Sequence, residues 1–399
     1  MEGLVIEGPL AGVAEGFAER LRCLGYKRRA AERQVALLAH LSCWMEKAGT
    51  CPRELSAAGV AEFLAERRRL GYARLVTDEG MGVLLGYLRE MGALPAAGRP
   101  EPSGPLDVVM GRYTRFLLLE RGLRDRTVEH YEMAARLFAR AVGVEEEADL
   151  GRLSAADVSR FVVGACARPV KMSPRELVSA LRAFLRFCHL EGLTATVLAG
   201  AVPSYASWRG TSLPKNLPPS KTSRLLRSCD RRRAQGRRDY AMLTCLLRLG
   251  LRAGEVAGLR LEDFDWRAGE LVVHGKGPRT ERMPLPSDVG EAVAGYLRRG
   301  RPSTPDRSVF VRLAAPLVGL SSGGVTEAVY AACDRAGLPR VGAHALRHSA
   351  ASDMLRAGGS LAEIGQVPRH RNAGTTAICA KVDRVALAEL ARPWPGGGR

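Results

Sequence analysis

Apolar side chains recur at helical spacing over residues 11–46, 54–70 and 77–92, with short polar breaks between the three stretches. This spacing gathers the apolar residues on one face of each helix, where they can form a core. A Pro- and Gly-rich break from Pro95 to Pro105 follows and is typical of a linker. The pattern therefore predicts an N-terminal helical domain over residues 1–95.

The helical pattern then repeats. RELSAAGVAEFL (Arg53–Leu64) matches GRLSAADVSRFV (Gly151–Val162) at an offset of 98 residues, and GYLREMGAL (Gly86–Leu94) lines up with AFLRFCHLEGL (Ala183–Leu193). In the first pair a Ser follows a Leu and precedes a helical run, as an N-cap residue does. We therefore expect a second helical domain over residues 105–199, of which the first is a degenerate copy. Chance similarity between Ala- and Arg-rich helices is the alternative.

The junction after this repeat is basic and rich in proline. Residues 200–240 hold Pro214, Pro218 and Pro219, which disfavour helix, and ten Lys or Arg lie between Arg209 and Arg238. A basic extended linker over residues 200–220 can lie along a phosphate backbone. A solvated loop without a partner is the alternative.

The pattern becomes mixed from Asp239 onward, in a third domain expected over residues 221–399. Tyr240–Gly250 is an apolar run that predicts a helix closed by glycine, and AGEVAGL (Ala253–Leu259) begins the next helix. GELVVHGKGPRTERMPLP (Gly269–Pro286) predicts two short strands around a Gly-Lys-Gly turn. Further helices are predicted at 287–299, 324–336, 344–356 and 360–366.

The net charge of the chain is strongly positive. Its 399 residues include 60 Lys and Arg against 42 Asp and Glu, a formal net charge of +18. Most of the basic residues are Arg, whose planar guanidinium suits phosphate. A strongly basic protein usually meets a polyanion, although solubility alone is a possible reason for the charge. Since aromatic residues make up only 6% of the chain, stacking on unpaired bases is not indicated, and duplex DNA is the expected partner.

Several other classes of protein are disfavoured by the sequence. Nine Cys are scattered without a CxxC pair, which argues against a zinc ribbon and against a disulfide framework. No run approaches the roughly 18 apolar residues that a membrane span needs. The first 17 residues carry three Glu and no Lys or Arg, unlike a signal peptide. We therefore expect a cytoplasmic protein, associated with the nucleoid when bound to DNA.

Four motifs in the last third of the chain carry candidate chemistry. They are GLRAGEVAGLRL with Arg252 and Glu255, HGKGPRTERMPL with Lys276 and Arg279, HALRH with His344, Arg347 and His348, and LAEIGQVPRHRNAGTTAICAKVD with His370 and Cys379. In this order the motifs resemble the signatures of the tyrosine recombinases, the phage-integrase family of DNA breaking-and-rejoining enzymes. The resemblance covers about residues 105–390 and is strongest after residue 239.

The resemblance implies a role for each matched residue. Arg252 and Arg347 are the pair that clamps the non-bridging phosphate oxygens, with Glu255 orienting the first of them. A neutral His344 accepts the proton of the nucleophile, with His348 beside it as a supporting residue. His370 adds a hydrogen bond to the phosphate, and Lys276 donates a proton to the leaving 5′-oxygen.

Two further expectations concern DNA contacts and metals. Arg209, Lys215, Lys221 and Arg279 are expected DNA contacts. No metal or other cofactor is expected, because cationic side chains replace the metal. Zinc held by His344 and His348 is the alternative, but Ala345 stands where a zinc-protease helix has Glu.

The family pattern is broken at the nucleophile. Cys379 occupies the position of the attacking tyrosine, and no Tyr follows Tyr330, which is itself a poor substitute. A cysteine sulfur is a soft nucleophile and falls several ångströms short of a phenol oxygen, and misplacement by about 1 Å can cost ~100-fold. Pro368 is a second departure, since proline disfavours helix and lies two residues before His370. Two departures favour natural loss of the cleavage step over engineered or accidental substitution.

The sequence as a whole predicts a multidomain protein. All-α, SAM-like core-binding domains precede a mixed α+β, mainly helical tyrosine-recombinase catalytic domain with a small β-hairpin. The expected function is site-specific DNA recombination or integration on duplex DNA, with the chain's own cleavage impaired. The expected assembly is a homo-oligomer on DNA, tetrameric by family, or a hetero-oligomer with related recombinases, and no membrane. Leu387 and Leu390 are interface candidates.

Two other interpretations remain open. The chain could be a catalytically inactive DNA-binding regulator or a structural partner of an active recombinase. Alternatively, a neighbouring protomer could donate the missing tyrosine.

Overall fold

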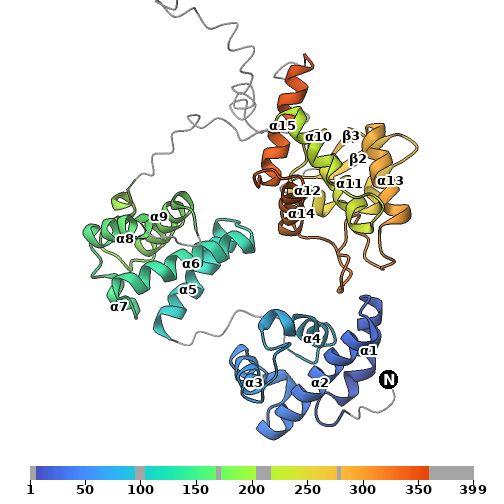
Figure 1. Cartoon of the computed structure of the whole chain (residues 1–399). Coiled ribbons are helices and arrows are strands. Elements are labelled where there is room, and N and C mark those ends of the chain that lie inside the picture. The colour runs from blue at the N-terminus through green and yellow to red at the C-terminus, as the bar shows by residue number, and fades with distance from the viewer. Residues whose placement is uncertain (1–5, 95–103, 168–171, 204–216, 276–279, 359–399) are drawn as a thin grey trace, which may run out of the picture. The chain divides into compact units, whose positions relative to one another are not determined.

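The computed structural model describes residues 6–94, 104–167, 172–203, 217–275 and 280–358. The chain divides into two compact units. Figure 1 labels their helices and strands. One holds residues 95–209 together with 56–60, and the other holds residues 1–55, 61–94 and 210–399. No described helix is long and apolar enough to cross a membrane.

Four helices account for most of residues 6–94. They are α1 (Ala14–Cys23), α2 (Arg28–Ala48), α3 (Ala57–Arg69) and α4 (Asp78–Glu90). The stretch predicted as helical over residues 11–46 is two helices, because Gly25 takes a left-handed conformation, with φ of 75°, at the corner between α1 and α2. The buried residues repeat at helical spacing and include Phe17, Leu21, Leu38, Leu41, Phe63, Met81, Leu84 and Leu88.

A second set of helices occupies residues 104–203. It comprises α5 (Pro105–Arg115), a π-helical turn (Phe116–Glu120), α6 (Asp125–Val142), α7 (Glu147–Leu150), α8 (Ala155–Ala167), α9 (Pro174–Leu190) and a 3₁₀ turn (Leu198–Ala201). Aromatic rings fill the core, with ring centroids 5.1 Å apart for Tyr113 and Phe184 and 5.2 Å apart for Phe138 and Phe161. These edge-on contacts are the favoured arrangement for buried rings.

The last described part of the chain is mixed. Its helices are α10 (Pro219–Arg227), α11 (Ala234–Arg248), α12 (Ala253–Gly258), α13 (Ser287–Arg299), α14 (Ser322–Arg335) and α15 (Ala343–Arg356). Its strands are β1 (Phe264–Asp265), β2 (Glu270–His274) and β3 (Thr280–Pro284), which form an antiparallel sheet in the order β1-β2-β3. The predicted hairpin is confirmed, with Val272 opposite Arg282 and His274 opposite Thr280. Strand β1 was not predicted.

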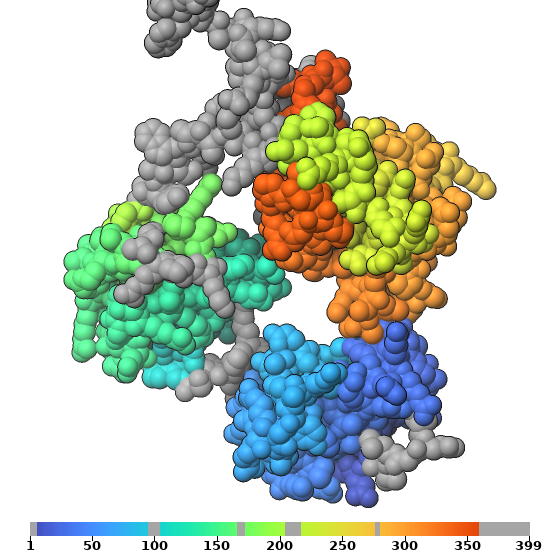
Figure 2. All heavy atoms as spheres, viewed as in Figure 1, coloured from blue at the N-terminus to red at the C-terminus, as the bar shows by residue number. Residues whose placement is uncertain are grey.

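Helix α11 lies at the centre of this part. Residues 241–247 are all buried, and α11 packs against α13, α14 and α15. The single core that results includes Leu246, Leu271, Val293 and Leu346, drawn from helices and sheet alike. Figure 2 shows these segments, from yellow-green to orange-red, packed into one body. The expected order of helical units followed by a mainly helical unit with a small sheet is confirmed.

The prediction that proline keeps the 200–240 segment extended is wrong for its second half. Helix α10 begins at Pro219 directly after Pro218. Proline at the first helical position loses no hydrogen bond, because that N–H has no partner within the helix. Leu217 is also buried, and its N–H donates to Ser349 Oγ at 2.8 Å. The core of the last described part of the chain therefore includes Leu217, which lies inside the linker predicted over residues 200–220.

Gly236, near the start of α11, allows a close backbone approach. A Cβ at this position would lie 2.0 Å from the carbonyl oxygen of Asp230. We expect Gly236→Ala to lower the free energy of unfolding by about 2–3 kcal/mol, because the backbone must shift to relieve the overlap. The matched control is Gly295→Ala in α13, whose added carbon meets only Arg299 Nη2 at 3.9 Å and should be neutral or slightly stabilising. Urea denaturation checks both, and equal midpoints for the two variants would contradict the expectation.

Candidate active site

The site begins at the turn between α11 and α12. Helix α11 ends at Arg248, and Gly250 reverses the chain with φ of 58°, a conformation that suits glycine. Leu251 is fully buried and fixes the turn to the core. Arg252 follows as the N-cap residue of α12, so its side chain leaves the turn at a defined point, with 43% of it exposed.

Glu255 holds the backbone and the side chain of Arg252. One carboxylate oxygen, Oε2, accepts the Arg252 backbone N–H at 2.8 Å, and the other, Oε1, accepts from Arg252 Nη1 at 2.5 Å. The Glu255 side chain is only 5% exposed. A buried carboxylate is stable only when paired with charge and hydrogen bonds, so Glu255 and the nearby guanidiniums depend on each other.

Arg347 on α15 is the second guanidinium at this carboxylate. Its Nη1 lies 4.0 Å from Glu255 Oε2 and donates to the carbonyl oxygen of Gly250 at 2.6 Å. The side chain is 1% exposed. A buried charge of this size is costly unless it is paired. The structure thus brings Arg347 to Gly250, 97 positions earlier in the chain, and to the buried carboxylate of Glu255.

His344 and His348 lie one turn apart on α15, on the face that also carries Arg347. Their ring centroids are 4.4 Å apart, with an angle of 77° between the ring planes. Partial burial, and then the charges of Arg347 and Arg252, lower the pKa of His344. Burial, His344 and Arg347 together lower the pKa of His348 to about 4. Both imidazoles are therefore neutral at neutral pH, the form that accepts a proton.

The lowered pKa of His348 makes stability depend on pH. The unfolded chain binds this proton near pH 6.5, whereas the folded chain does so only near pH 4. Protonation therefore favours the unfolded state in this window, so the His348 contribution is complete above pH 6.5 and is lost as pH falls toward 4. After a discount for partial exposure, the loss should be about 2 kcal/mol.

Urea denaturation of the native chain and of His348→Gln between pH 7 and pH 4 measures this contribution. The difference in free energy between the two proteins should shrink as pH falls, because only the native chain carries the titrating imidazole. A difference that stays constant across the range would contradict the pKa shift.

A second cluster of polar side chains joins the end of β2 to the start of β3 and to Asp263. His274 Nε2 lies 3.0 Å from Oδ1 of buried Asp263, and His274 Nδ1 lies 3.3 Å from Thr280 Oγ1. The Asp263 carboxylate also accepts the Arg260 N–H at 2.7 Å. Sequence reasoning missed His274 and Asp263. The signal that could have found them is a histidine two residues before Lys276, at the end of the first strand of the predicted hairpin.

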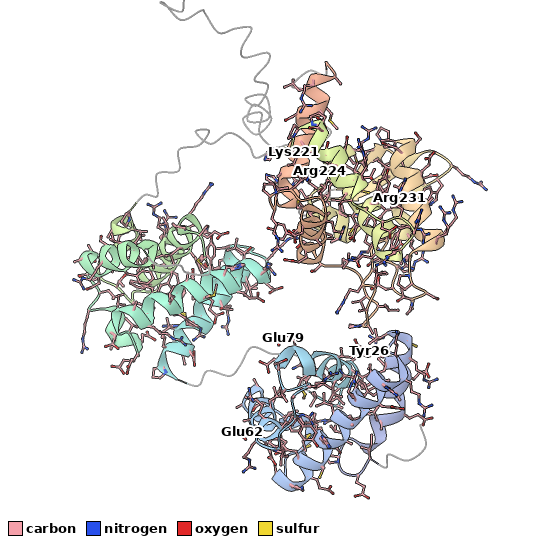
Figure 3. All side chains as sticks on the ribbon, viewed as in Figure 1. Tyr26, Glu62, Glu79, Lys221, Arg224 and Arg231 are labelled. Atoms are coloured by element: carbon pink, nitrogen blue, oxygen red, sulfur yellow. The ribbon has the colours of Figure 1, made fainter. Side chains whose placement is uncertain are left out.

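Other predicted site residues lie outside the described part of the chain. These are Arg209, Lys215, Lys276, Arg279, His370 and Cys379, together with Pro368, Leu387, Leu390 and the helix predicted at 360–366. Lys221 is described and lies exposed on α10, where Figure 3 labels it beside Arg224. Tyr330 lies on α14 with the Arg340 guanidinium 5.9 Å from its ring centre.

The grouping of His, Cys, Asp and Glu side chains bears on metal binding. Within the described ranges, no group of three His, Cys, Asp or Glu side chains could hold a metal ion. The His344–His348 pair has Arg347 between its members in the sequence, and a guanidinium is a poor neighbour for a cation.

Known families and proteins match most of this chain. Residues 110–192 match the family model "Phage integrase, N-terminal SAM-like domain", and residues 215–384 match the model "Phage integrase family". The chain is 39% identical to "Putative integrase/recombinase y4rA" of Sinorhizobium fredii, over 98% of this chain and 96% of that relative. It is 30% identical to "Tyrosine recombinase XerD" of Mycobacterium tuberculosis, over 71% of this chain and 95% of that relative.

The fold also matches a solved structure. The crystal structure of a lambda integrase tetramer bound to a Holliday junction has a TM-score of 0.55 and 16% sequence identity, over 74% of this chain and 85% of that chain. At this identity the match establishes the shared fold.

Proposed function

This chain belongs to the phage integrase family, and we propose on that basis that it is a site-specific recombinase that binds and positions duplex DNA. We further propose that its own strand cleavage is impaired, because Cys379 stands at the position of the attacking tyrosine. The observation that carries the first part is the pair of guanidiniums, Arg252 and Arg347, at the buried carboxylate of Glu255.

The two guanidiniums suit a phosphodiester under attack. Such a phosphate gains negative charge on its non-bridging oxygens, and preorganised cations stabilise that charge without moving at the moment of reaction. Arg252 is the exposed member of the pair and Arg347 the buried one. Burial strengthens the field of Arg347, because screening by water is weaker inside the protein. Glu255 fixes the position of Arg252 and offsets part of the repulsion between the two cations.

Proton transfer is assigned to the remaining residues. His344, neutral and next to Arg347 on α15, takes the proton of the attacking hydroxyl in the family reaction. Lys276 protonates the leaving 5′-oxygen, and the His274 contacts fasten both strands of the hairpin that carries it. His370 contributes a hydrogen bond to the phosphate. No metal or other cofactor has a role in this assignment.

DNA binding is assigned to the basic C-terminal part of the chain. Residues 204–399 hold 32 Lys and Arg against 17 acidic residues, so most of the net charge of the chain lies here. Lys221, Arg224 and Arg231, labelled in Figure 3, belong to this part, as do Arg209, Lys215 and Arg279 in the sequence. The proposed assembly is a tetramer on DNA, like that of the lambda integrase structure, formed with identical or related chains. Acting on duplex DNA, the protein would work in the cytoplasm, at the nucleoid.

A nicked suicide duplex tests the proposal. The native chain should bind the duplex, and its affinity should fall steeply with salt, because phosphate contacts release counterions. It should form no covalent protein–DNA adduct that survives denaturing electrophoresis. Absence of binding at low salt would contradict the proposed DNA function, whereas an adduct mapped to Cys379 would contradict the loss of cleavage.

A catalytically inactive partner is the second candidate function, and Cys379 is the observation that favours it. Such a chain would occupy a recombination site and either complete or block an assembly with active relatives. Mixing it with an active relative on a shared site separates the two roles. A helper should maintain or raise the yield of recombinant DNA at fixed total protein, whereas a blocker should lower the yield in proportion to its share.

A further inference from the structure

The four helices of residues 6–94 correspond one to one with helices of residues 104–203. Helix α3 (Ala57–Arg69) and helix α8 (Ala155–Ala167) have the same length at an offset of 98 residues. Helix α2 corresponds to α6, and α4 to α9, at offsets of 96 to 97. The family model for the SAM-like domain matches only the second set, at residues 110–192.

Most of the positions buried in α2 and α3 are buried in α6 and α8 as well. Between α2 and α6 the matched buried pairs are Ala31 and Val128, Leu37 and Ala134, Leu38 and Ala135, Leu41 and Phe138, and Ser42 and Ala139. Between α3 and α8 they are Val60 and Val158, Phe63 and Phe161, and Leu64 and Val162. Since burial follows the tertiary packing rather than the local sequence, this agreement indicates a shared fold.

The ends of the helices agree as well. Thr77 Oγ1 accepts the N–H of the residue three positions on, at the start of α4, and Ser173 Oγ does the same at the start of α9, both at 3.3 Å. Gly25 and Gly122 both have positive φ at the corner before the second helix, 75° and 56°. Buried Phe17 and Leu21 of α1 correspond to buried Tyr113 and Leu117 at an offset of 96, one less than the offset between α2 and α6, as the one extra residue of the π-helical turn Phe116–Glu120 requires.

We propose that residues 6–94 are a second SAM-like domain and that it binds the phosphate backbone of duplex DNA through Lys27, Arg29 and Arg33. We name these three residues the α2 basic patch. The inference rests on the proposed DNA binding of the chain and adds a contact surface that lies outside both matched family segments. The y4rA relative aligns over 98% of this chain, so it shares the N-terminal segment.

Charge at the three positions is common to both copies. At an offset of 97, Lys27, Arg29 and Arg33 correspond to Arg124, Arg126 and His130, and all six residues are exposed. Throughout the described ranges, no carboxylate forms a salt bridge with any of the six. Many other arginines of these two regions are paired, for example Arg20 with Glu90 and Arg112 with Glu147.

Position on the helix strengthens the argument. Lys27 is the N-cap residue of α2, and Arg29 lies in the first turn. Cations are disfavoured at a helix N-terminus by the helix dipole, by typically 0.3–1 kcal/mol each. Arg33 lies four residues after Arg29 and therefore on the same face. Both copies carry basic residues on this face, although the helix dipole disfavours cations there. This arrangement indicates an anionic partner.

A solvated helix face with no partner is the simplest alternative. Residues 1–94 carry 13 Lys and Arg against 12 acidic residues, so the excess positive charge is local rather than spread over the domain. Within residues 27–33 there are four basic residues and one acidic residue, and Glu32 is already paired with Arg28, whose Nε lies 2.9 Å away. The partner that fits is a polyanion lying across the start of α2, just after Tyr26, which Figure 3 labels.

Salt-dependent binding of the full chain tests the proposal. The probe is a fluorescent 60-base-pair duplex of mixed sequence, titrated at several salt concentrations. The variant Lys27→Gln/Arg29→Gln/Arg33→Gln removes the α2 basic patch. The control Lys47→Gln/Arg53→Gln/Arg68→Gln removes the same charge from exposed positions elsewhere in the first copy. Neither variant should unfold at a lower temperature, because all six side chains are exposed, and the patch variant should be slightly more stable, because two cations are removed from the start of α2.

The expected result is a smaller salt dependence for the patch variant alone. Each lost phosphate contact lowers the slope of log K against log salt by about 0.9, so three contacts should lower it by about 2 to 3. Affinity at low salt should fall at least tenfold relative to the control variant.

If the native chain binds and both variants keep its slope, the patch has no role, while DNA binding by the rest of the chain stands. If the native chain does not bind, the proposed function itself fails. If the patch variant loses only binding to an acidic protein, the partner was misassigned.

Discussion

Replacing Cys379 by Tyr is expected to give covalent protein–DNA adducts on a nicked suicide duplex, where the native chain gives none. The tyrosine hydroxyl supplies a hard oxygen nucleophile and extends several ångströms farther from the backbone than a cysteine sulfur. Since a misplacement of about 1 Å can cost ~100-fold, the gain should exceed two orders of magnitude. The adduct is counted by denaturing electrophoresis and located by mass spectrometry of the linked peptide.

The variant Cys379→Phe is the matched control for this experiment. It restores the ring without the hydroxyl, so it should form no adduct while binding DNA as the Tyr variant does. If the Tyr variant binds DNA but stays unreactive, the fault lies elsewhere in the last motif, and Pro368, two residues before His370, is the first residue to change. In that outcome the missing nucleophile is not a sufficient explanation for the loss of cleavage.

Replacing Arg347 by Ala is expected to have the largest effect on stability. Its guanidinium is buried, donates to the Gly250 carbonyl at 2.6 Å and lies 4.0 Å from Glu255. Removing it leaves the Gly250 carbonyl without its donor, takes one of two cations from the buried Glu255 carboxylate and empties a buried site, at a cost of about 3–5 kcal/mol. Domains are usually stable by about 5–15 kcal/mol, so a large share of the total is at risk. Urea denaturation at pH 7 measures the loss.

Arg252→Ala is the comparison for Arg347→Ala, since it removes the other guanidinium from the same carboxylate. Its side chain is 43% exposed, and the Arg252 backbone N–H still donates to Glu255, so the loss should be near 1 kcal/mol. In the Cys379→Tyr background both alanine variants should lose adduct formation. Comparable losses of stability for the two would contradict the different burial of the two side chains.

Glu255→Gln separates charge from shape at the same site. In the Arg347→Ala background the carboxylate has only Arg252 left to compensate, so neutralising it should cost less stability than it does in the native chain, where buried Arg347 also depends on it. The coupling energy between the two positions should fall within about 0.5–3 kcal/mol, as for residues in one ionic network. Additive losses would mean that Glu255 does not depend on Arg347.

Local elements were largely predictable from the sequence. The helix expected at 287–299 has those bounds, and the Gly-Lys-Gly hairpin forms between β2 and β3. Both follow from apolar spacing and turn residues, which act within a few positions. Helix α10 was missed because Pro218 and Pro219 were interpreted as helix breakers, whereas proline at a first helical position starts a helix. Strand β1 has only two residues, too short for any periodicity.

The site was predictable as a set of residues and not as a geometry. The resemblance of the motifs to the family's signatures implied Arg252, Glu255, His344 and Arg347. Arg347 reaches Gly250 across 97 positions of the chain, and this contact depends on α15 packing against α11. His274 and Asp263 were missed for the same reason, since their hydrogen bond joins a strand to a turn.

The sequence by itself determined the charge and the order of the motifs, since these are facts of composition and position, and it predicts that Cys379 stands in place of the attacking tyrosine. Tertiary structure decided which cation is buried and which is exposed, and that one carboxylate lies beside both. It also decided that His344 and His348 are neutral, because desolvation and nearby guanidiniums lower their pKa values. Burial and distance between remote segments set those properties, and neither exists until the chain has folded.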